Sequence, residues 1–281
     1  MQEALPSIET YPALKVVDEQ LVPVQERVSE EEPITVYLNG KEMVTMLCSP
    51  VEQRYLALGF LVSEGMIERI EDLTNLTVDD DRGLVWAEAD KVPDNAGRMY
   101  LKRCLTACCG RGRAEFYFAN DARVSKWIES DLRVRAQDIN RYAHLLEETS
   151  ATHSITYGVH SGAIVDGGKL VCFSEDIGRH NVFDKLYGKC LEERVSLEDK
   201  ILVFSGRVSS EIILKVSKMG VPVVVARSVP TSLAIDMAAK LGITLIGVAK
   251  GDWFHVYTHT ERVLVDSGCP SDIVNESLGS K

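Results

Sequence analysis

The stretch ILVFSGRVSSEIILKVSKMGVPVVVARSVPTSLAIDMAAKLGITLIGVAK, residues 201–250, decides the fold. It repeats one unit: a short apolar run, a turn rich in Gly, Ser and Pro, and a helical segment. The apolar runs are residues 201–204, 221–226 and 244–249, and the helical segments are residues 211–218 and 233–241. Runs that are apolar throughout predict strands buried on both faces, and helices between them predict a parallel sheet with right-handed crossovers.

The residues before this stretch extend the same α/β domain. Apolar residues at helical spacing predict a helix whose buried face carries Ile139, Tyr142, Ala143 and Leu146. A hairpin is expected next, with strands at 155–159, 163–165 and 170–173 around the turn Asp166-Gly167-Gly168. A helix over 182–191 completes the prediction.

The first part of the chain predicts a smaller α+β domain. Strands at 34–38 and 41–47 flank Asn39-Gly40, a pair that readily takes the positive φ values of a two-residue hairpin turn. Ser49-Pro50 predicts the start of a helix that ends at Gly65. Two further strands are expected at residues 73–78 and 84–89.

These elements divide the chain into four parts. We expect an extended lead-in with one edge strand at 1–29, a small α+β domain at 30–97, an α/β domain at 98–265 that includes a cysteine loop at 103–113, and a tail at 266–281. The breaker-rich residues 91–97 mark the domain boundary.

Composition excludes several classes of protein. The 281 residues carry a formal net charge of −11, which argues against sequence-independent nucleic-acid binding, because such binding depends on Lys and Arg. No apolar run approaches the roughly 18 residues that a membrane helix needs. Seven unevenly spaced cysteines form no disulfide framework, and no secretory signal opens the sequence, so we expect a cytoplasmic location.

Three turns follow the predicted parallel strands, at residues 205–210, 228–232 and 250–253. Ligands of open α/β sheets bind at the carboxyl ends of strands, where helix N-termini also present unpaired N–H groups. Hydroxyl, cationic and aromatic residues in these turns predict a pocket for a flat anion such as a nucleotide. Ser209 and Thr231 can also act simply as helix N-caps, whereas Arg207 suits phosphate recognition. No dinucleotide-fold or Walker motif is present.

The segment EDIGRHN, residues 175–181, is a second dense polar stretch between a strand and a helix. His180 is either a proton carrier or a helix-start residue, and His160 is either a structural or a site histidine.

The segment RCLTACCGRGR, residues 103–113, combines cysteines, arginines and glycines. Nearby cations lower a thiol pKa and so favour the nucleophilic thiolate. The spacing fits a zinc site poorly and adjacent cysteines bridge only with strain, so we expect a reactive thiol at Cys108 or Cys109. Packing accounts for the other apolar-context cysteines, Cys48, Cys172 and Cys190.

The chain carries several ordered motifs, namely GVHSGA (158–163), EDIGRHN with Asp184-Lys185, SGRVSSE (205–211) and PTSLA (230–234), and earlier Glu32-Pro33, Asn39-Gly40 and LGFLVSEG (58–65). Together these motifs resemble the formate dehydrogenase accessory sulfurtransferase family. The resemblance spans residues 30 to 260.

The resemblance implies a dimeric sulfur carrier with a cytidine-deaminase-like mixed sheet, helices on both faces and no zinc. It implies that a cysteine desulfurase supplies sulfur as a persulfide, and that the acceptor is the molybdenum or tungsten bis-guanine-dinucleotide cofactor of apo formate dehydrogenase. Cys108 takes the first position of the family's Cys-x-x-Cys, and Arg111 stands where the second cysteine falls, which leaves open whether Cys109 replaces it.

The resemblance also maps a cofactor-binding segment onto residues 248–253, without the proline and final arginine often found there. The predicted cofactor-binding residues are Val248, Ala249, Lys250, Gly251, Asp252, Trp253, Gly206, Arg207, Ser209, Ser228, Thr231, His160, Arg179 and His180.

Two other functions compete with sulfur transfer. A non-catalytic chaperone for the cofactor and the dehydrogenase would use the same pocket without the thiols. A zinc deaminase needs His-x-Glu and Pro-Cys-x-x-Cys, but no glutamate follows in His160-Ser161-Gly162 and the second motif is absent.

Overall fold

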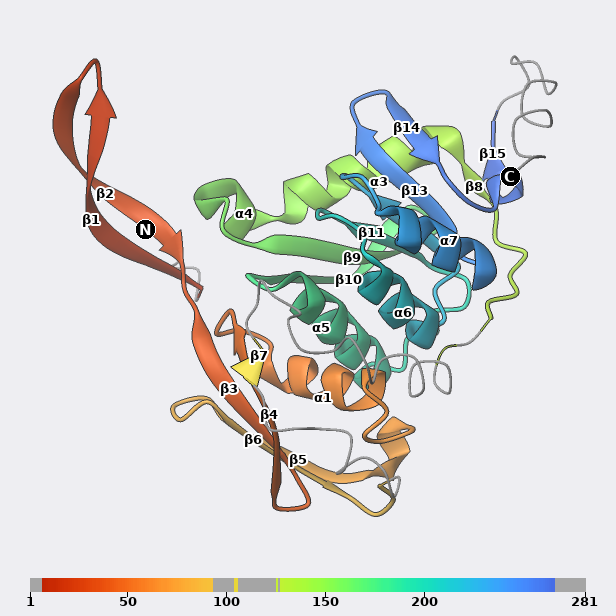
Figure 1. The fold of residues 1–281 in the computed structure, drawn as a ribbon, viewed down its shortest axis with the longest axis horizontal. Helices are drawn as coiled ribbons and strands as arrows, with labels where there is room; N and C mark the ends of the chain where they lie inside the picture. The colour runs from red at the N-terminus through yellow and green to blue at the C-terminus, as the bar shows by residue number, and fades with distance from the viewer. Residues whose placement is uncertain (1–6, 93–103, 106–124, 126, 266–281) are drawn as a thin grey trace.

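The computed structural model describes residues 7–92, 104–105, 125 and 127–265 (Figure 1). A six-stranded mixed sheet organises its second half, in the order β10-β9-β11-β12-β13-β14. These strands are β9 (His160–Asp166), β10 (Lys169–Asp176), β11 (Ile201–Phe204), β12 (Val223–Ala226), β13 (Thr244–Lys250) and β14 (Trp253–Val256). β11, β12 and β13 run parallel, which confirms the prediction from the repeated units.

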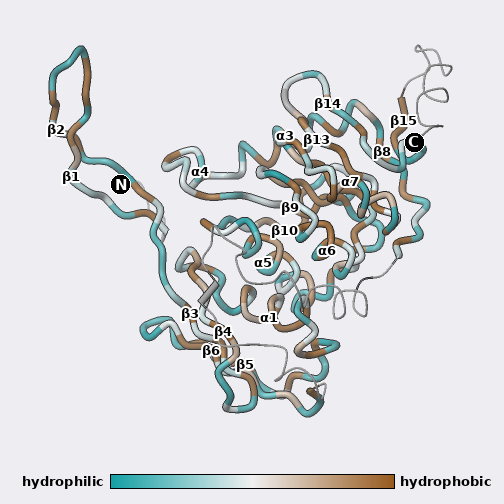
Figure 2. The backbone as a smooth tube through the Cα atoms, in the orientation of Figure 1, coloured by the Kyte–Doolittle hydropathy of each residue, from teal (hydrophilic) through white to brown (hydrophobic). Residues whose placement is uncertain are grey.

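Helices cover both faces of this sheet. They are α3 (Ala136–Thr149) on one face, and α5 (Arg179–Glu192), α6 (Ser210–Met219) and α7 (Ser232–Lys240) on the other. Alternate residues of β11 serve the two faces: Ile201 and Val203 join the core under α3, while Leu202 and Phe204 join the core under α5 to α7. In Figure 2, brown segments mark hydrophobic residues, and these are concentrated in the central strands and in the helices packed against them.

The first half of the chain forms a five-stranded sheet in the order β5-β6-β3-β4-β7, covered by α1 (Gln53–Ser63). The strands are β3 (Glu32–Leu38), β4 (Lys41–Cys48), β5 (Leu73–Asp79), β6 (Leu84–Ala89) and β7 (Cys104–Leu105), with the short helix η1 (Ile70–Asp72) before β5. Asn39 and Gly40 form the predicted turn, with φ of 49° and 74°. β7 pairs with β4, so this part of the cysteine stretch joins the first sheet.

Helix α1 starts later than Ser49-Pro50 predicts. Ser49 does not cap the helix: its hydroxyl accepts a hydrogen bond from the Ile177 backbone N–H (3.2 Å), and its own N–H donates to Asp176 Oδ2 (3.1 Å). The residue is therefore used to join the two halves of the molecule. The predicted end is confirmed, because Gly65 takes a φ of 67° just after the helix.

The lead-in prediction for residues 1–29 is wrong in part. Two long strands, β1 (Ile8–Val17) and β2 (Gln20–Ser29), form a hairpin that projects from the body (Figure 1). Its turn residues Asp18 and Glu19 have φ of 48° and 63°. Glycine or asparagine usually occupies turn positions with such φ values, so Asp18-Glu19 does not mark the hairpin in the sequence.

The strand predicted at 155–159 is also wrong. Residues 151–156 form the helix α4 (Ala151–Thr156), because the carboxylate of Glu175 accepts hydrogen bonds from the Thr152 and His153 backbone N–H groups at the helix start. His160 consequently begins β9 instead of ending a strand. The helix predicted from Ile139, Tyr142, Ala143 and Leu146 is confirmed as α3, with these four residues buried.

The two halves meet where α1 crosses α5. A Cβ placed on Gly59 would lie 1.8 Å from the Asp184 carbonyl oxygen, and one on Gly188 would lie 2.0 Å from the Tyr55 carbonyl oxygen. Only glycine permits so close an approach. Buried ion pairs flank the crossing: Lys185 Nζ lies 2.7 Å from Asp176 Oδ2, and Lys215 Nζ lies 2.6 Å from Asp184 Oδ1.

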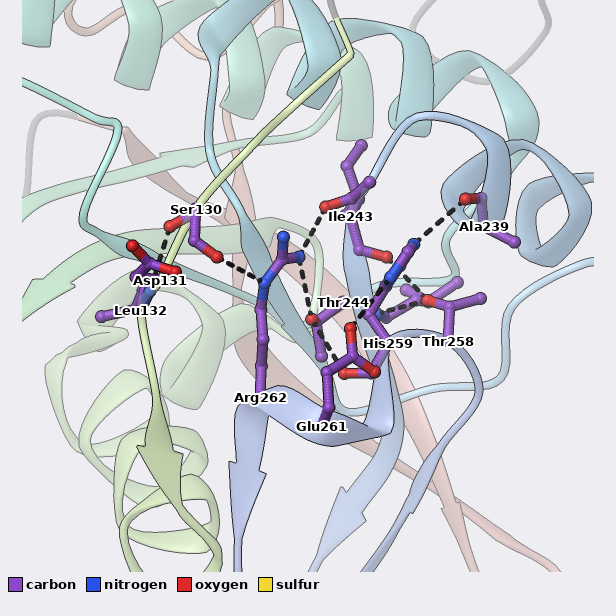
Figure 3. Close-up of polar contacts among 12 residues, drawn as sticks. Ser130, Asp131, Leu132, Ala239, Ile243, Thr244, Thr258, His259, Glu261 and Arg262 are labelled. Atoms are coloured by element: carbon purple, nitrogen blue, oxygen red, sulfur yellow. Dashed lines mark hydrogen bonds and ion pairs between the residues drawn. The ribbon is translucent and has the colours of Figure 1, made fainter. Parts of the chain in front are cut away.

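The amino edge of the six-stranded sheet, defined by residues 242–245 and 258–262, is closed by a network around buried Arg262 (Figure 3). The guanidinium donates to Ser130 O (3.1 Å), Gly242 O (2.6 Å) and Thr244 Oγ1 (3.3 Å). Arg262 lies in the short helix η2 (Thr260–Arg262), which leads into β15 (Val263–Leu264) beside β8 (Val134–Arg135). The network ties the last described elements to the segment that enters α3.

Candidate functional site at the carboxyl edge of the sheet

The carboxyl edge of the six-stranded sheet, defined by residues 205–211, 227–232 and 248–253 with His160, Arg179 and His180, gathers most of the predicted site residues. β11, β12 and β13 all end here, and β9 runs antiparallel to β11, so its first residues lie at the same edge. Hydrogen bonds join the pieces: Ser161 N–H donates to Ser205 Oγ (2.9 Å) and Ser205 N–H donates to Ser161 O (3.0 Å).

Gly206 is buried against His160. A Cβ at Gly206 would lie 3.0 Å from His160 Nδ1 and 2.7 Å from Phe204 Cζ, so this position requires glycine. The His160 and Phe204 rings are 6.0 Å apart. Burial, with the Arg179 charge as the second cause, lowers the pKa of His160, which keeps the imidazole neutral near pH 7.

His180 faces an acidic partner that the sequence analysis did not single out. Its Nε2 lies 2.7 Å from Oε2 of Glu211 in the first turn of α6, an ion-pair contact without hydrogen-bond alignment. Ser209 precedes α6 in the N-cap position, but its side chain makes no cap hydrogen bond, and its buried Oγ has no hydrogen-bond partner among the described residues. The Ser209 hydroxyl is therefore left for a ligand at the start of α6, whereas His180 at the start of α5 is paired with Glu211.

Arg207 and Thr231 have different surroundings. Arg207 is exposed in the turn after β11 and forms no ion pair with the part of the chain that the structure describes. Thr231 caps α7 through a hydrogen bond from the Ala234 N–H to its hydroxyl (3.3 Å), which confirms the capping interpretation for this residue. The backbone carbonyl of Ser228 accepts a hydrogen bond from the Val248 N–H (3.3 Å).

The predicted cofactor-binding segment is irregular. Val248 has a φ of 58°, which is unfavourable for a β-branched residue, and the pairing of β13 with β14 shifts register between Gly247 and Lys250. Gly251 has a φ of 64° in the turn that leads to exposed Asp252. Ala249 is fully buried in the core, so its side chain does not reach the edge.

A row of aromatic rings begins at the predicted residue Trp253 and continues along β14 to His255 and then to Tyr257, two residues that the sequence analysis did not assign to the site. Trp253 is 55% exposed, its ring centroid lies 5.3 Å from that of His255, and His255 lies 5.9 Å from Tyr257. A Cβ placed on Gly247 would contact both Tyr257 and Pro230, so the aromatic row borders the turn after β12. The alternation of Trp253, His255 and Tyr257 with buried-side Phe254 and Val256 was the available signal.

A pocket of about 230 Å³ opens at the same edge between β9, β11, β12 and the end of α3. Arg227 lines it and forms an ion pair with Glu147, which also lines it. The remaining lining residues include hydroxyls and rings, namely Ser150, His153, Ser154, Tyr157, Ser161 and Ser205. The prediction for this turn named Ser228 and Thr231, whereas the structure places Arg227 at the pocket.

Several predictions fall outside the described residues. Cys108, Cys109 and most of the boundary at 91–97 lie there. For Lys250 the structure describes the backbone, which pairs with Trp253. Among the described residues, no group of three or more His, Cys, Asp or Glu side chains could hold a metal ion. None of the described helices is long and apolar enough to cross a membrane.

The fold and the edge define a mixed α/β protein whose strand ends form one polar and aromatic face. Residues 29–264 match the model of the FdhD/NarQ family, and the chain belongs to this family.

Relatives agree with this assignment, and a solved structure shares the fold. The chain is 41% identical over 254 residues to "Sulfur carrier protein FdhD" of Geobacillus kaustophilus. This alignment covers 90% of this chain and 96% of the relative. It is 42% identical over 240 residues to the protein of the same name from Bacillus subtilis, covering 85% and 91%. Its fold is similar, with a TM-score of 0.75 and 24% identity, to the crystal structure of a proposed formate dehydrogenase accessory protein from Desulfotalea psychrophila, covering 92% and 100%.

Proposed function

We propose that this protein is a sulfur carrier that loads sulfur onto Cys108 and delivers it to the molybdenum or tungsten bis-guanine-dinucleotide cofactor of formate dehydrogenase. Relatives that share about two fifths of its residues are named sulfur carrier proteins, and that name supports the transfer of sulfur in general. The donor is a cysteine desulfurase, and the acceptor cofactor is substrate rather than a resident group.

The observation that carries the proposal is the carboxyl edge itself. It presents a guanidinium without a described ion-pair partner at Arg207, a buried hydroxyl without a described hydrogen-bond partner at Ser209, and an exposed indole at Trp253. A guanidinium suits phosphate oxygens, and an exposed indole offers a stacking face to a flat base. These are the groups that a guanine dinucleotide would use.

The order of strands and helices supports the likeness to cytidine deaminases. We propose that the starts of α5 and α6, the helices after β10 and β11, form the reacting centre of this protein. Here those helix starts carry His180 and Glu211 in place of zinc ligands, so we assign them to proton handling at the site.

Loading needs only thiol chemistry on this chain. The Cys108 thiolate attacks the terminal sulfur of the donor persulfide, the donor's sulfur–sulfur bond breaks, and the donor cysteine leaves as a thiolate. Three arginines within residues 103–113 favour the Cys108 thiolate.

The test is intact-mass measurement after incubation with a cysteine desulfurase and cysteine. Wild type should gain one sulfur that a reductant removes, Cys108→Ala should not, and Cys109→Ala should gain it as wild type does. An unchanged adduct in the Cys108→Ala, Cys109→Ala double variant would refute loading at these thiols. Equal loading of Cys108→Ala and Cys109→Ala would instead show that each of the two thiols can carry the sulfur.

The same double variant separates transfer from chaperoning. A chaperone needs the carboxyl edge but not the thiols, so formate dehydrogenase activity restored in cells by the double variant would favour the chaperone. The sulfur-carrier proposal expects no restored activity.

We also propose a cytoplasmic homodimer. The β1–β2 hairpin exposes large apolar side chains, and an isolated two-stranded hairpin is marginal in water, so a second copy is the occupant that its apolar surface requires. The exposed residues are Tyr11, Leu14, Val16, Val17, Leu21, Val22 and Val28. Light scattering on a Leu14→Glu, Val16→Glu variant should give a monomer, whereas an unchanged dimer would remove the hairpin from the interface.

A further inference from the structure

Two cysteines outside the cysteine loop lie in contact within the core of the six-stranded domain. Cys172 lies on β10 and Cys190 in the last turn of α5, and each exposes 1% of its surface. The Cys190 thiol donates a hydrogen bond to Cys172 Sγ across 3.5 Å. A disulfide has a sulfur–sulfur distance of about 2.05 Å, so closing this gap needs a movement of roughly 1.5 Å.

The two thiols are not equivalent. The hydrogen bond donated by Cys190 lowers the pKa of Cys172, and the same bond, together with burial, raises the pKa of Cys190. Cys172 is therefore the thiol that ionises first. Cys48 provides a contrast, because it is buried without a thiol partner among the described residues, and burial raises its pKa to about 12.

The pair lies close to solvent despite its burial. β10 is the edge strand of the six-stranded sheet, and its neighbouring residue Val171 is 37% exposed. The pairing of β10 with β9 shifts register between Leu170 and Cys172. The Cys172 thiol donates a hydrogen bond to the carboxylate of exposed Glu193 across 3.8 Å, a contact that opposes the pKa-lowering effect of Cys190. The pair therefore lies under an irregular edge strand rather than in the middle of the sheet.

We propose that Cys172 and Cys190 form a redox-active dithiol that closes to a disulfide when hydrogen peroxide oxidises it. The Cys172 thiolate attacks the peroxide, the oxygen–oxygen bond breaks, and the departing oxygen leaves as water after taking up a proton. The Cys190 sulfur then attacks the sulfenic acid at Cys172 and displaces a second water. Two thiols and one hydrogen peroxide thus give one disulfide and two waters, and both sulfurs supply the electrons.

The bridge would enclose the segment from Cys172 to Cys190. That segment includes His180 at the carboxyl edge and the buried Asp176–Lys185 ion pair, and oxidation would fasten the end of α5 to β10. Cross-linking a loop of this length restricts the unfolded chain and should raise Tm by several degrees. This inference does not rest on the proposed sulfur-carrier function.

The experiment uses the full chain with Cys104, Cys108, Cys109 and Cys269 changed to serine, which leaves Cys48, Cys172 and Cys190. The folded protein is treated with hydrogen peroxide, denatured, alkylated and mapped by mass spectrometry. We expect a linked peptide that joins Cys172 to Cys190, an alkylated Cys48, and return of both thiols with dithiothreitol.

The matched control adds Cys190→Ser, which should abolish the linked peptide and the rise in Tm. Three alkylated thiols after treatment, or a linked peptide that contains Cys48, would overturn the proposal. Irreversible oxidation of Cys172 without a link to Cys190 would also overturn it. These outcomes are measured in the protein that keeps Cys48, Cys172 and Cys190, so they hold even if the Cys190→Ser control folds poorly.

Discussion

The two edges of the six-stranded sheet use their polar groups in opposite ways. At the amino edge, Arg262 donates three hydrogen bonds, and Thr258 both donates to Ile243 O and accepts from Leu245 N–H. At the carboxyl edge, Ser209 has no described hydrogen-bond partner, Arg207 has no described ion-pair partner, and Val248 has a strained backbone. Polar groups that satisfy one another stabilise a fold, whereas groups left without partners are available to a ligand.

The largest expected effect is at the amino edge. Arg262→Gln should lower the free energy of unfolding by about 3 kcal/mol, because the carbonyls of Ser130 and Gly242 lose a charged donor in a buried place. Chemical denaturation measures the change. The matched variant Arg207→Gln, at the carboxyl edge, should change stability by less than about 0.5 kcal/mol. Equal losses in the two variants would erase the contrast between the edges.

A smaller effect is expected on ligand affinity. Trp253→Ala should weaken binding of guanosine diphosphate, used as a fragment of the cofactor, by about tenfold, because stacking of a base on an aromatic ring contributes about 1–3 kcal/mol. Calorimetric titration gives the dissociation constants. Trp127→Ala removes a comparably exposed indole away from the carboxyl edge and should leave the affinity unchanged. An unaltered affinity in Trp253→Ala would exclude the aromatic row as the base-binding face.

The strain at Val248 predicts a gain in stability of about 1 kcal/mol for Val248→Gly. Relief of an unfavourable φ is worth about 1–3 kcal/mol, and the added freedom of glycine in the unfolded chain removes about 0.4–1 kcal/mol of it. Val225→Gly, in the regular buried part of β12, should destabilise the protein instead. A loss in both variants, measured by thermal unfolding, would mean that Val248 stores no strain.

The smallest expected effect depends on pH. The pKa of His160 is lower in the folded protein than its unfolded value of 6.5, so protonation favours the unfolded state. The contribution of His160 is therefore fully present above about pH 6.5 and is lost as the pH falls towards the folded pKa. Stability measured from pH 8 to pH 5 should fall less steeply in His160→Asn than in wild type. Parallel curves would show that His160 does not titrate in this range.

The sequence predicted the elements whose signals are local. The strands β11 and β12 and the helices after them follow from apolar runs and turn residues, and the Asn39-Gly40 turn follows from its φ preferences. The errors arose where distant residues decide. Ser49 bonds to Ile177 instead of capping α1, and Glu175 caps a helix at residues 151–156 that looks like a strand on its own.

The site was predicted in the same uneven way. Arg207, Ser209 and His180 follow from motifs at strand ends, and all three lie at the carboxyl edge. Glu211, Arg227, His255 and Tyr257 were missed, because their relevance depends on which side chains the sheet brings together. No local pattern reports that His180 faces Glu211 or that Arg227 pairs with Glu147.

The most direct test of the difference between the edges is hydrogen–deuterium exchange of the full chain with and without guanosine diphosphate. Peptides covering 205–211, 227–232 and 248–257 should exchange more slowly when the nucleotide is bound, and peptides covering 242–245 and 258–262 should be unchanged. Protection at the amino edge, or no protection at the carboxyl edge under saturating nucleotide, would contradict the assignment of the carboxyl edge as the ligand site.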